Sequence, residues 1–343
     1  MSSEPDGLPR WPVTLLIGML GSGKTTLLRH ILLDPAMRGT AVLINEIGEI
    51  GIDHHLIERI DGETVLMRSG CLCCTMRADL PQSLNALRRR WLGDDRLDLR
   101  RVVIETTGLA VPGPILRELA TNPLVASDFP LSSVVATVDA QHALRQTRSR
   151  EEARQQIAVA DIVVLTKTDL ANKATTAAVR REVSGLNPRA PVIAVTSGVV
   201  DAKRLIADHD RKEEDIRAWA DVDGAPDPLG HVTHAPHNGI GTLSLEARDP
   251  IAWAALTAFL SGLVGEFAPS LLRFKGILNV LGSDLPVVVH GVHDAFYPAE
   301  TLEAWPTQDR NSRLVLILDR MAQQREKLSR LIGSSGIDWS IAG

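Results

Sequence analysis

Residues 18–25, Gly-Met-Leu-Gly-Ser-Gly-Lys-Thr, have the residue types and spacing of a phosphate-binding loop, G-x-x-x-x-G-K-[ST]. The glycines let backbone N–H groups turn inward around a β-phosphate, while Lys24 would place its charge beside the β- and γ-phosphate oxygens. The Thr25 hydroxyl would bind Mg²⁺. An apolar run precedes the motif and a helical pattern follows it, as such a loop requires. The nucleotide-binding residues predicted here are Gly18, Gly21, Ser22, Gly23, Lys24, Thr25 and Thr26.

A carboxylate follows the next strongly apolar run, residues 101–104, at Glu105. At the end of a strand beside the phosphate loop, this carboxylate can orient the magnesium shell, directly or through water. The N–H of Gly108, three residues on, can meet a γ-phosphate. We therefore predict that Lys24, Thr25 and Glu105 form the catalytic group, and no residue stands out as the one that positions an attacking water.

A second motif, Thr166-Lys167-Thr168-Asp169, follows the apolar run 162–165 and would select the base. The Asp169 carboxylate can accept hydrogen bonds from guanine N1–H and the 2-amino group, whereas adenine offers neither donor. The stem of Lys167 would pack on the base plane, and residues 195–197 would close over it. These features predict GTP rather than ATP. An ATP-dependent small-molecule kinase would keep the phosphate loop but would have to select adenine.

All three cysteines fall in one short segment, Cys71-Leu72-Cys73-Cys74, which we place in a loop before a helix that begins near Met76. Thiolates bind Zn²⁺ or Co²⁺ in tetrahedral arrays, so Cys71, Cys73 and Cys74 are predicted metal ligands. Glu49 is the favoured carboxylate partner, with His54 in reserve. A redox dithiol is the competing functional interpretation, and a filled structural zinc site and buried thiols also stay open as alternatives.

The net charge and the aromatic content of the chain argue against nucleic acid and membrane lipid as partners. The formal net charge of −5 gives no broad attraction to nucleic acid or anionic lipid, and 3% aromatic residues make a base-stacking surface improbable. We expect no membrane span, and the clustered thiols favour a reducing, cytoplasmic location. The triplet His231, His234 and His237 contains Pro236 and so has no regular helical face; we expect these histidines to be exposed rather than ligands.

The elements that must position these residues follow from periodicity. Short β-rich runs alternate with amphipathic stretches up to about residue 197, which is typical of a doubly wound, mostly parallel α/β sheet. We expect a nucleotide domain at 1–206, a polar linker at 207–230 with a helix at 214–220, and a smaller α+β domain at 231–343. The predicted strands are 13–17, 41–44, 102–104, 134–138, 162–165 and 192–195, then 241–245, 277–280, 287–289 and 314–318; the predicted helices include 25–33, 81–91, 251–263 and 321–331.

Taken in this order, the motifs make the chain resemble the CobW-type metallochaperone GTPases, whose members include cobalamin-synthesis, zinc-responsive and nitrile hydratase activator proteins. The residues that carry the resemblance are the phosphate loop, 45–53, 70–74, 105–108 with Pro112, and 166–169. The run 273–276, Arg-Phe-Lys-Gly, is similar to a C-terminal signature of the family. His290 stands where members commonly have glutamine, and the long histidine-rich run of many members is absent from the sequence.

The resemblance implies a P-loop GTPase that hydrolyses GTP to GDP and phosphate with Mg²⁺, carries Zn²⁺ or Co²⁺, and delivers it to a client metalloprotein. A GTP-dependent homodimer is a further assembly to test. Residues 45–53 lie where P-loop GTPases sense the γ-phosphate, so GTP binding could bring Glu49 toward the thiolates. The alternative is a metal-gated GTP switch that docks on a client and transfers nothing.

Overall fold

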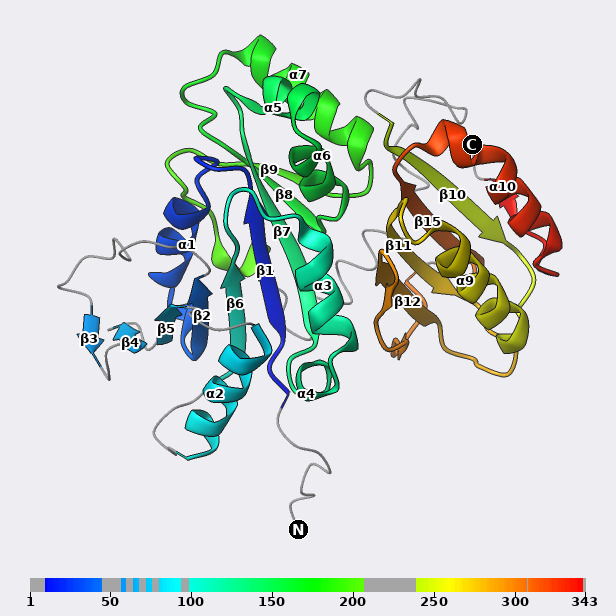
Figure 1. The fold of residues 1–343 in the computed structure, drawn as a ribbon, viewed down its shortest axis with the longest axis horizontal. Helices are drawn as coiled ribbons and strands as arrows, with labels where there is room; N and C mark the ends of the chain where they lie inside the picture. The colour runs from blue at the N-terminus through cyan, green and yellow to red at the C-terminus, as the bar shows by residue number, and fades with distance from the viewer. Residues whose placement is uncertain are drawn as a thin grey trace.

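The computed structural model describes residues 10–44, 80–93, 99–206, 239–306 and 308–341, together with the backbone of 57–59, 64–67 and 72–75. Two sheets organise these residues and lie side by side, with α3 (Pro112–Thr121) and α6 (Glu151–Ala158) between them (Figure 1). The fold class predicted from the sequence, a mostly parallel α/β sheet with a smaller α+β domain, is confirmed.

The first sheet has nine strands in the order β3-β4-β5-β2-β6-β1-β7-β8-β9. From β5 to β9 all neighbours run parallel, whereas β3, β4 and β5 pair antiparallel at one end of the sheet. The central strands β1, β2, β6 and β8 are buried along their whole length because helices cover both faces. The strands are β1 Val13–Gly18, β2 Thr40–Ile44, β3 Ile57–Arg59, β4 Thr64–Met67, β5 Leu72–Thr75, β6 Arg101–Glu105, β7 Leu131–Asp139, β8 Ile162–Thr166 and β9 Val192–Ala194.

Alternate residues of β1 enter two separate apolar clusters, as the pleat of a strand requires. Leu15 and Ile17 pack in one cluster, with α2, α3, α6 and α7, and Leu16 packs in the other, with α1. Because both faces are covered, the functional groups of this sheet are left to its edges and strand ends. The remaining helices are α1 Lys24–Leu32, α2 Leu80–Leu92, α4 Pro123–Ala126, α5 Ala143–Ser149 and α7 Lys173–Leu186.

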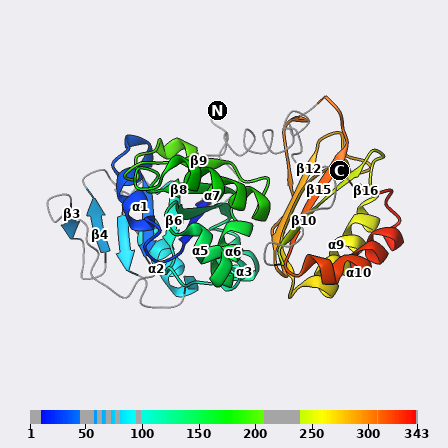
Figure 2. The ribbon, with the colours of Figure 1, turned by 90° about the horizontal axis from the view of Figure 1, so that it is seen from above.

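The second sheet is antiparallel, in the order β13-β12-β11-β15-β10-β16, with β14 also paired to β12. Seen from above, α9 (Trp253–Phe267) and α10 (Met321–Ser334) cover the face that is turned away from the first sheet (Figure 2). The strands are β10 Gly241–Ala247, β11 Leu271–Leu278, β12 Val287–Val292, β13 Ala295–Phe296, β14 Glu300–Thr301, β15 Ser312–Leu318 and β16 Ser340–Ile341.

An ion cluster joins the two sheets. Asp161, immediately before β8, pairs with Arg273 and Lys275 of β11, and its Oδ2 accepts a hydrogen bond from Val134 N at 2.9 Å. Arg273 also donates to the Val159 carbonyl. Burial alone would raise the pKa of Asp161, but the two cations hold it well below its usual value. The signature 273–276 therefore binds the second sheet to the first.

A second contact fixes the turn between β12 and β13 on α3. Tyr297 donates its hydroxyl to the Leu116 carbonyl at 2.9 Å, and Arg117 pairs with Asp294 at 2.7 Å. The ring of His293 lies against Gly113, where a Cβ would come within 2.7 Å of it. The glycine is needed for this close approach.

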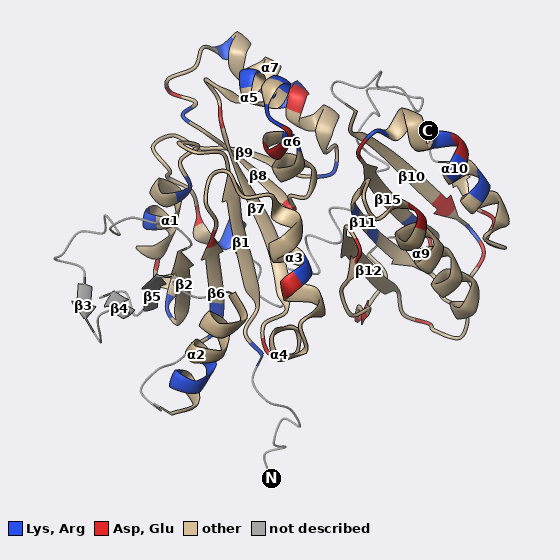
Figure 3. Ribbon diagram, viewed as in Figure 1, with Lys and Arg blue, Asp and Glu red and all other residues tan. Residues whose placement is uncertain are grey.

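Charges are carried mainly by the helices and loops, while the strands are largely uncharged (Figure 3). The end of α2 is basic through Arg88, Arg89 and Arg90, and α10 carries three basic residues and one acidic residue. No helix in the described ranges is both long and apolar enough to cross a bilayer.

The predicted strands are found in place, with ends shifted by a few residues. The predicted strand 277–280 is instead the end of β11, which begins six residues earlier at Leu271. The predicted helix at 214–220 and both predicted domain boundaries, at 206/207 and 230/231, fall in or beside 207–238, which is outside the described residues. Those boundaries stay predictions.

Candidate nucleotide and metal site

The phosphate loop joins β1 to α1 with a backbone that glycine makes accessible. Gly21 and Gly23 have φ of 74° and 93°, in the left-handed region. At Gly18 a Cβ would lie 2.2 Å from Thr137 Oγ1, so no side chain fits there. α1 begins after Gly23 without a side-chain cap, and the N–H groups of a first helical turn are those that bind an anion.

Lys24 and Thr25 both reach the groups that their predicted roles require. Lys24 is buried, and its Nζ donates to the Gly18 and Met19 carbonyls at 2.9 and 3.3 Å, so its charge is held inside the loop. Thr25 donates its hydroxyl to Glu105 Oε1 at 2.7 Å. Glu105 is fully buried at the carboxyl end of β6, which neighbours β1. A hydroxyl and a carboxylate oxygen are ligands that Mg²⁺ accepts, so this pair fits the cation.

The segment after β6 packs directly on the phosphate loop. A Cβ on Gly108 would lie 2.3 Å from Leu20 N, so the two backbones touch only because residue 108 has no side chain. Two residues on, the Ala110 carbonyl accepts a hydrogen bond from the buried Gln156 Nε2 at 3.0 Å. Glu105 and Gly108 thus meet the phosphate loop from one side.

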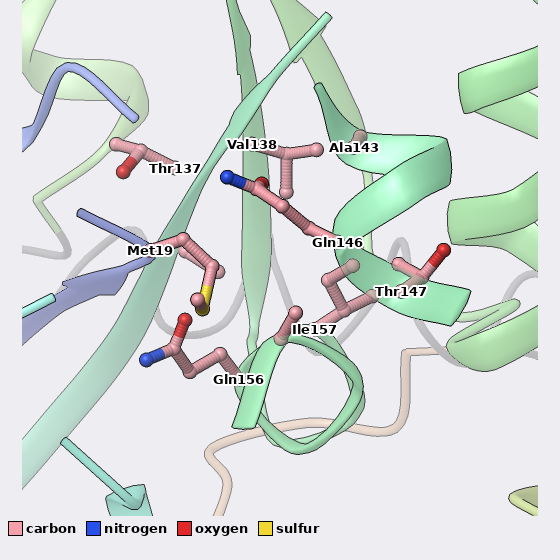
Figure 4. Close-up of a pocket in the computed structure, with 10 residues that line it drawn as sticks. Met19, Thr137, Val138, Ala143, Gln146, Thr147, Gln156 and Ile157 are labelled. Atoms are coloured by element: carbon pink, nitrogen blue, oxygen red, sulfur yellow. The ribbon is translucent and has the colours of Figure 1, made fainter. Parts of the chain in front are cut away.

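A small cavity lies beside this contact (Figure 4). Met19, Thr137 and Gln156 line part of it, together with residues of α5 and α6. Its volume of about 10 Å³ is room for about one water molecule, so it is not a nucleotide pocket.

The base motif is anchored to the phosphate loop and to β7. Thr166 Oγ1 donates to the Ser22 carbonyl at 2.7 Å, which ties the end of β8 to the phosphate loop. Lys167 has a left-handed φ of 55°, and its Nζ donates to Asp139 Oδ2 at 2.8 Å. Thr168 donates to the Val195 carbonyl at 3.1 Å, in the segment predicted to close over the base. Asp169 is exposed at this edge of the sheet, as a base-reading carboxylate must be.

Sequence reasoning missed Asp139 and Gln156. A signal existed for Asp139, because it ends a buried strand just as Glu105 does, at the same edge of a parallel sheet. Gln156 gave none, since its partner Ala110 is 46 residues away and is contacted through the backbone.

The cysteine segment differs from its prediction. Cys73 and Cys74 lie on strand β5, between β2 and β4, rather than in a loop. The predicted start of the following helix, near Met76, lies outside the described residues, and α2 is described from Leu80. The backbone hydrogen bonds of two neighbours draw this short run into the sheet, which local sequence patterns do not reveal.

The register places the cysteine strand near the phosphate site. Ile44 of β2 pairs with Thr75 on one side and with Glu105 on the other, so Cys74 lies one residue before the level of Glu105. Two strand spacings, about 10 Å, separate these backbones. Cys71, Glu49, His54 and the triplet His231, His234 and His237 lie outside the described residues. Among the side chains that are described, no group of three His, Cys, Asp or Glu residues could hold a metal ion.

His290, the departure noted in the C-terminal domain, is half-buried on β12 and stacks on Tyr297 with ring centroids 4.6 Å apart. Tyr297 in turn holds α3, so His290 lies behind the contact between the sheets rather than at the nucleotide edge.

Comparisons with known proteins agree with this arrangement. A family model described as CobW/HypB/UreG, nucleotide-binding domain, matches residues 12–194, and one described as Cobalamin synthesis protein cobW C-terminal domain matches 240–333. The chain is 33% identical to the zinc chaperone YjiA of Escherichia coli (strain K12) over 306 residues, 89% of this chain and 93% of that protein. It is 29% identical to the zinc chaperone CobW of Pseudomonas aeruginosa over 348 residues, 92% and 89% of the two chains.

A solved structure extends the likeness to the whole fold. The crystal structure of Zn(II)-bound YjiA GTPase from E. coli matches with a TM-score of 0.74 at 29% identity, covering 95% of this chain and 99% of that one. The likeness in fold therefore spans both sheets and nearly the full length of that protein. The chain belongs to the CobW/HypB/UreG family of nucleotide-binding domains, in the form that carries a CobW C-terminal domain.

Proposed function

We propose that this protein is a GTP-hydrolysing metal chaperone that binds Zn²⁺ or Co²⁺ through residues 71–74 and delivers the metal to a client protein. The observation that carries the proposal is the hydrogen bond from Thr25 to Glu105, made at the edge of the sheet where β5 brings the cysteine backbone two strands away. The names of the relatives, zinc chaperones, favour zinc as the cargo.

In this proposal the phosphate loop and β6 perform the hydrolytic chemistry. Lys24 would turn from the Gly18 and Met19 carbonyls toward the β- and γ-phosphates, and Thr25 and Glu105 would hold Mg²⁺, which would neutralise charge on the phosphate oxygens. The N–H of Gly108 faces the γ-phosphate. Asp169 reads guanine, with Thr166 fixing its loop to the phosphate loop.

Strand β2 is the physical link between nucleotide and metal. It pairs with the glutamate strand on one side and the cysteine strand on the other, and residues 45–53 follow directly from its end. If the γ-phosphate orders that segment, Glu49 completes the metal site. Hydrolysis would then release the segment and take Glu49 away from the metal. Because linkage is reciprocal, metal must tighten GTP by the factor by which GTP tightens metal, typically about 5–150-fold.

Nucleotide competition tests the first half of the proposal. GTP should displace a fluorescent guanine nucleotide at concentrations orders of magnitude below those needed for ATP, because adenine leaves the Asp169 carboxylate unsatisfied. Equal displacement by ATP would refute guanine selection and favour the adenine-dependent kinase.

Metal titration tests the second half. Zinc affinity would be measured against a competing chelator without nucleotide, with GDP and with a non-hydrolysable GTP analogue. We expect the analogue to tighten zinc, Glu49→Ala to abolish the difference, and Glu326→Ala, an exposed glutamate on α10, to preserve it. Identical affinities in all three nucleotide states would defeat the coupling.

Delivery is tested by following isotopically labelled zinc from the protein to a metal-free candidate client on GTP hydrolysis. Movement of the label with hydrolysis supports a chaperone. A nucleotide-dependent complex in which the label stays on the protein identifies a metal-gated switch instead.

A further inference from the structure

Asp139 is a buried carboxylate at the nucleotide edge to which neither the phosphate chemistry nor the metal site gives a role. It is 3% exposed and ends β7, where it pairs in register with Thr166 of β8. Its Oδ1 accepts a hydrogen bond from Gln141 N at 2.8 Å. Its Oδ2 accepts from Lys167 Nζ at 2.8 Å and lies 3.0 Å from His142 Nδ1.

The Lys167 ammonium needs such a partner if its stem is to lie under a base. Covering an ammonium with an aromatic ring removes water from it, and an unpaired charge is costly in that position. The Asp139 carboxylate satisfies the charge at the far end of the side chain, which leaves the methylene stem as an apolar shelf. The same ion pair restrains Lys167 in its left-handed backbone conformation.

The charge state of Asp139 is consistent with an ion pair to Lys167. Burial would raise the pKa of Asp139, but the hydrogen bonds from Lys167, His142 and Gln141 N together hold it below its usual value. The carboxylate therefore stays charged at neutral pH. The contacts with Gln141 N and His142 come from within three residues, as in a local turn, whereas Lys167 lies 28 residues on, after the neighbouring strand.

We propose that Asp139 is a positioning residue for nucleotide binding, which holds Lys167 by its ammonium so that the lysine stem forms the floor of the base site. The inference rests on the proposed function, because it assigns the base site to residues 166–169. Asp169 reads the edge of the base, whereas the Asp139–Lys167 pair supports its plane. Loss of the pair therefore weakens every purine that Asp169 accepts, by the same factor.

The test is Asp139→Asn in the full chain, since an asparagine oxygen can still accept from Gln141 N while the charge is lost. We expect the Kd for GTP to rise about tenfold, because a charge-assisted hydrogen bond is lost. The Kd for inosine triphosphate, which lacks the 2-amino group, should rise equally, and kcat at saturating GTP should stay within about twofold of wild type. Asp34→Asn is the matched control, because Asp34 accepts the same kind of local hydrogen bond, from Ala36 N at 2.8 Å, and follows α1 rather than lying in the base motif.

A second variant separates positioning from a general structural role. Lys167→Met keeps the length of the stem without the charge, and adding Asp139→Asn to it should change the GTP affinity by less than about twofold. Independent, multiplicative effects of the two changes would overturn the proposal. If Asp139→Asn lowers the thermal midpoint far more than Asp34→Asn does, Lys167→Met alone decides: an unchanged Kd for GTP overturns the inference.

The two levels of inference fail differently. If the wild-type protein binds GTP and ATP equally, the assignment of the guanine site to residues 166–169 is wrong. If the wild-type protein selects GTP but the Kd of Asp139→Asn for GTP is within about twofold of wild type, only the role of Asp139 is refuted.

Discussion

The Asp161 carboxylate forms the ion pairs that link the two sheets, and Asp161→Asn should destabilise the protein strongly. The side chains of Asp161, Arg273 and Lys275 are 20%, 11% and 20% exposed. Removing one charge from a fully buried pair costs about 3–5 kcal/mol, because the partner's charge is left uncompensated. Since these side chains keep some contact with water and Arg273 retains the Val159 carbonyl, we expect the free energy of unfolding to fall by about 3 kcal/mol.

Urea unfolding at pH 7, followed by circular dichroism and tryptophan fluorescence, measures this loss. The matched control is Glu266→Gln, which breaks a 3.6 Å pair with Lys327 whose side chains are 45% and 42% exposed. Such a surface pair should contribute less than about 1 kcal/mol. An Asp161→Asn variant that costs no more than this control would refute the reasoning.

The same pair predicts a pH dependence with a definite sign. The pKa of Asp161 is lowered in the folded protein from an ordinary value of 3.8, so as pH falls through that value the unfolded chain takes up the proton first. The stabilisation is complete above about pH 5 and is lost progressively below it. The stability difference between wild type and Asp161→Asn should therefore shrink between pH 5 and pH 2, and a constant difference over that range of about three units would contradict the assignment.

Three further predictions concern the nucleotide edge. Gly108→Ala should weaken GTP binding by about tenfold or more, because its Cβ would lie 2.3 Å from Leu20 N. Gly185→Ala is the control, since its Cβ would enter open space and should leave binding unchanged. Isothermal titration calorimetry compares the GTP affinities of the two variants. Lys24→Ala should remove most GTP hydrolysis in a phosphate-release assay, and undiminished turnover would sink the assigned phosphate site. Asp169→Asn should weaken GTP and favour xanthosine triphosphate, whose C2 carbonyl can accept from the new amide; an unchanged ratio of the two affinities would remove Asp169 from the base site.

The sequence predicted the elements whose signal is local. The apolar runs of β1, β2, β6, β7, β8 and β9 and the glycine spacing of the phosphate loop needed no knowledge of distant neighbours. The motifs also assigned Thr25 and Glu105 to one magnesium site, and the structure brings the two side chains within hydrogen-bond distance at the carboxyl ends of parallel strands.

The misses depend on non-local contacts. The cysteine run becomes a strand because β2 and β4 flank it, and nothing in Cys-Leu-Cys-Cys itself demands a strand. β11 begins at Leu271 although Arg273 and Lys275 interrupt its apolar pattern, since both cations are paired with Asp161 more than 100 residues earlier in the chain. The partner of Asp139 lies 28 residues on, across neighbouring strands.

The contact between the sheets also decides how the chain can be divided in the laboratory. Leu272 and Val292 of the second sheet, with Tyr297 just after β13, belong to the same buried apolar cluster as Leu116 and Ile157, which cover the first sheet. A recombinant fragment ended before residue 207 would uncover that surface, at a cost of about 25 cal/mol for each Å² of apolar area. It would also leave Asp161 without Arg273 and Lys275. Aggregation or lost activity of such a fragment would reflect this exposed core, so the contribution of the C-terminal half is better measured by point substitution in the intact chain.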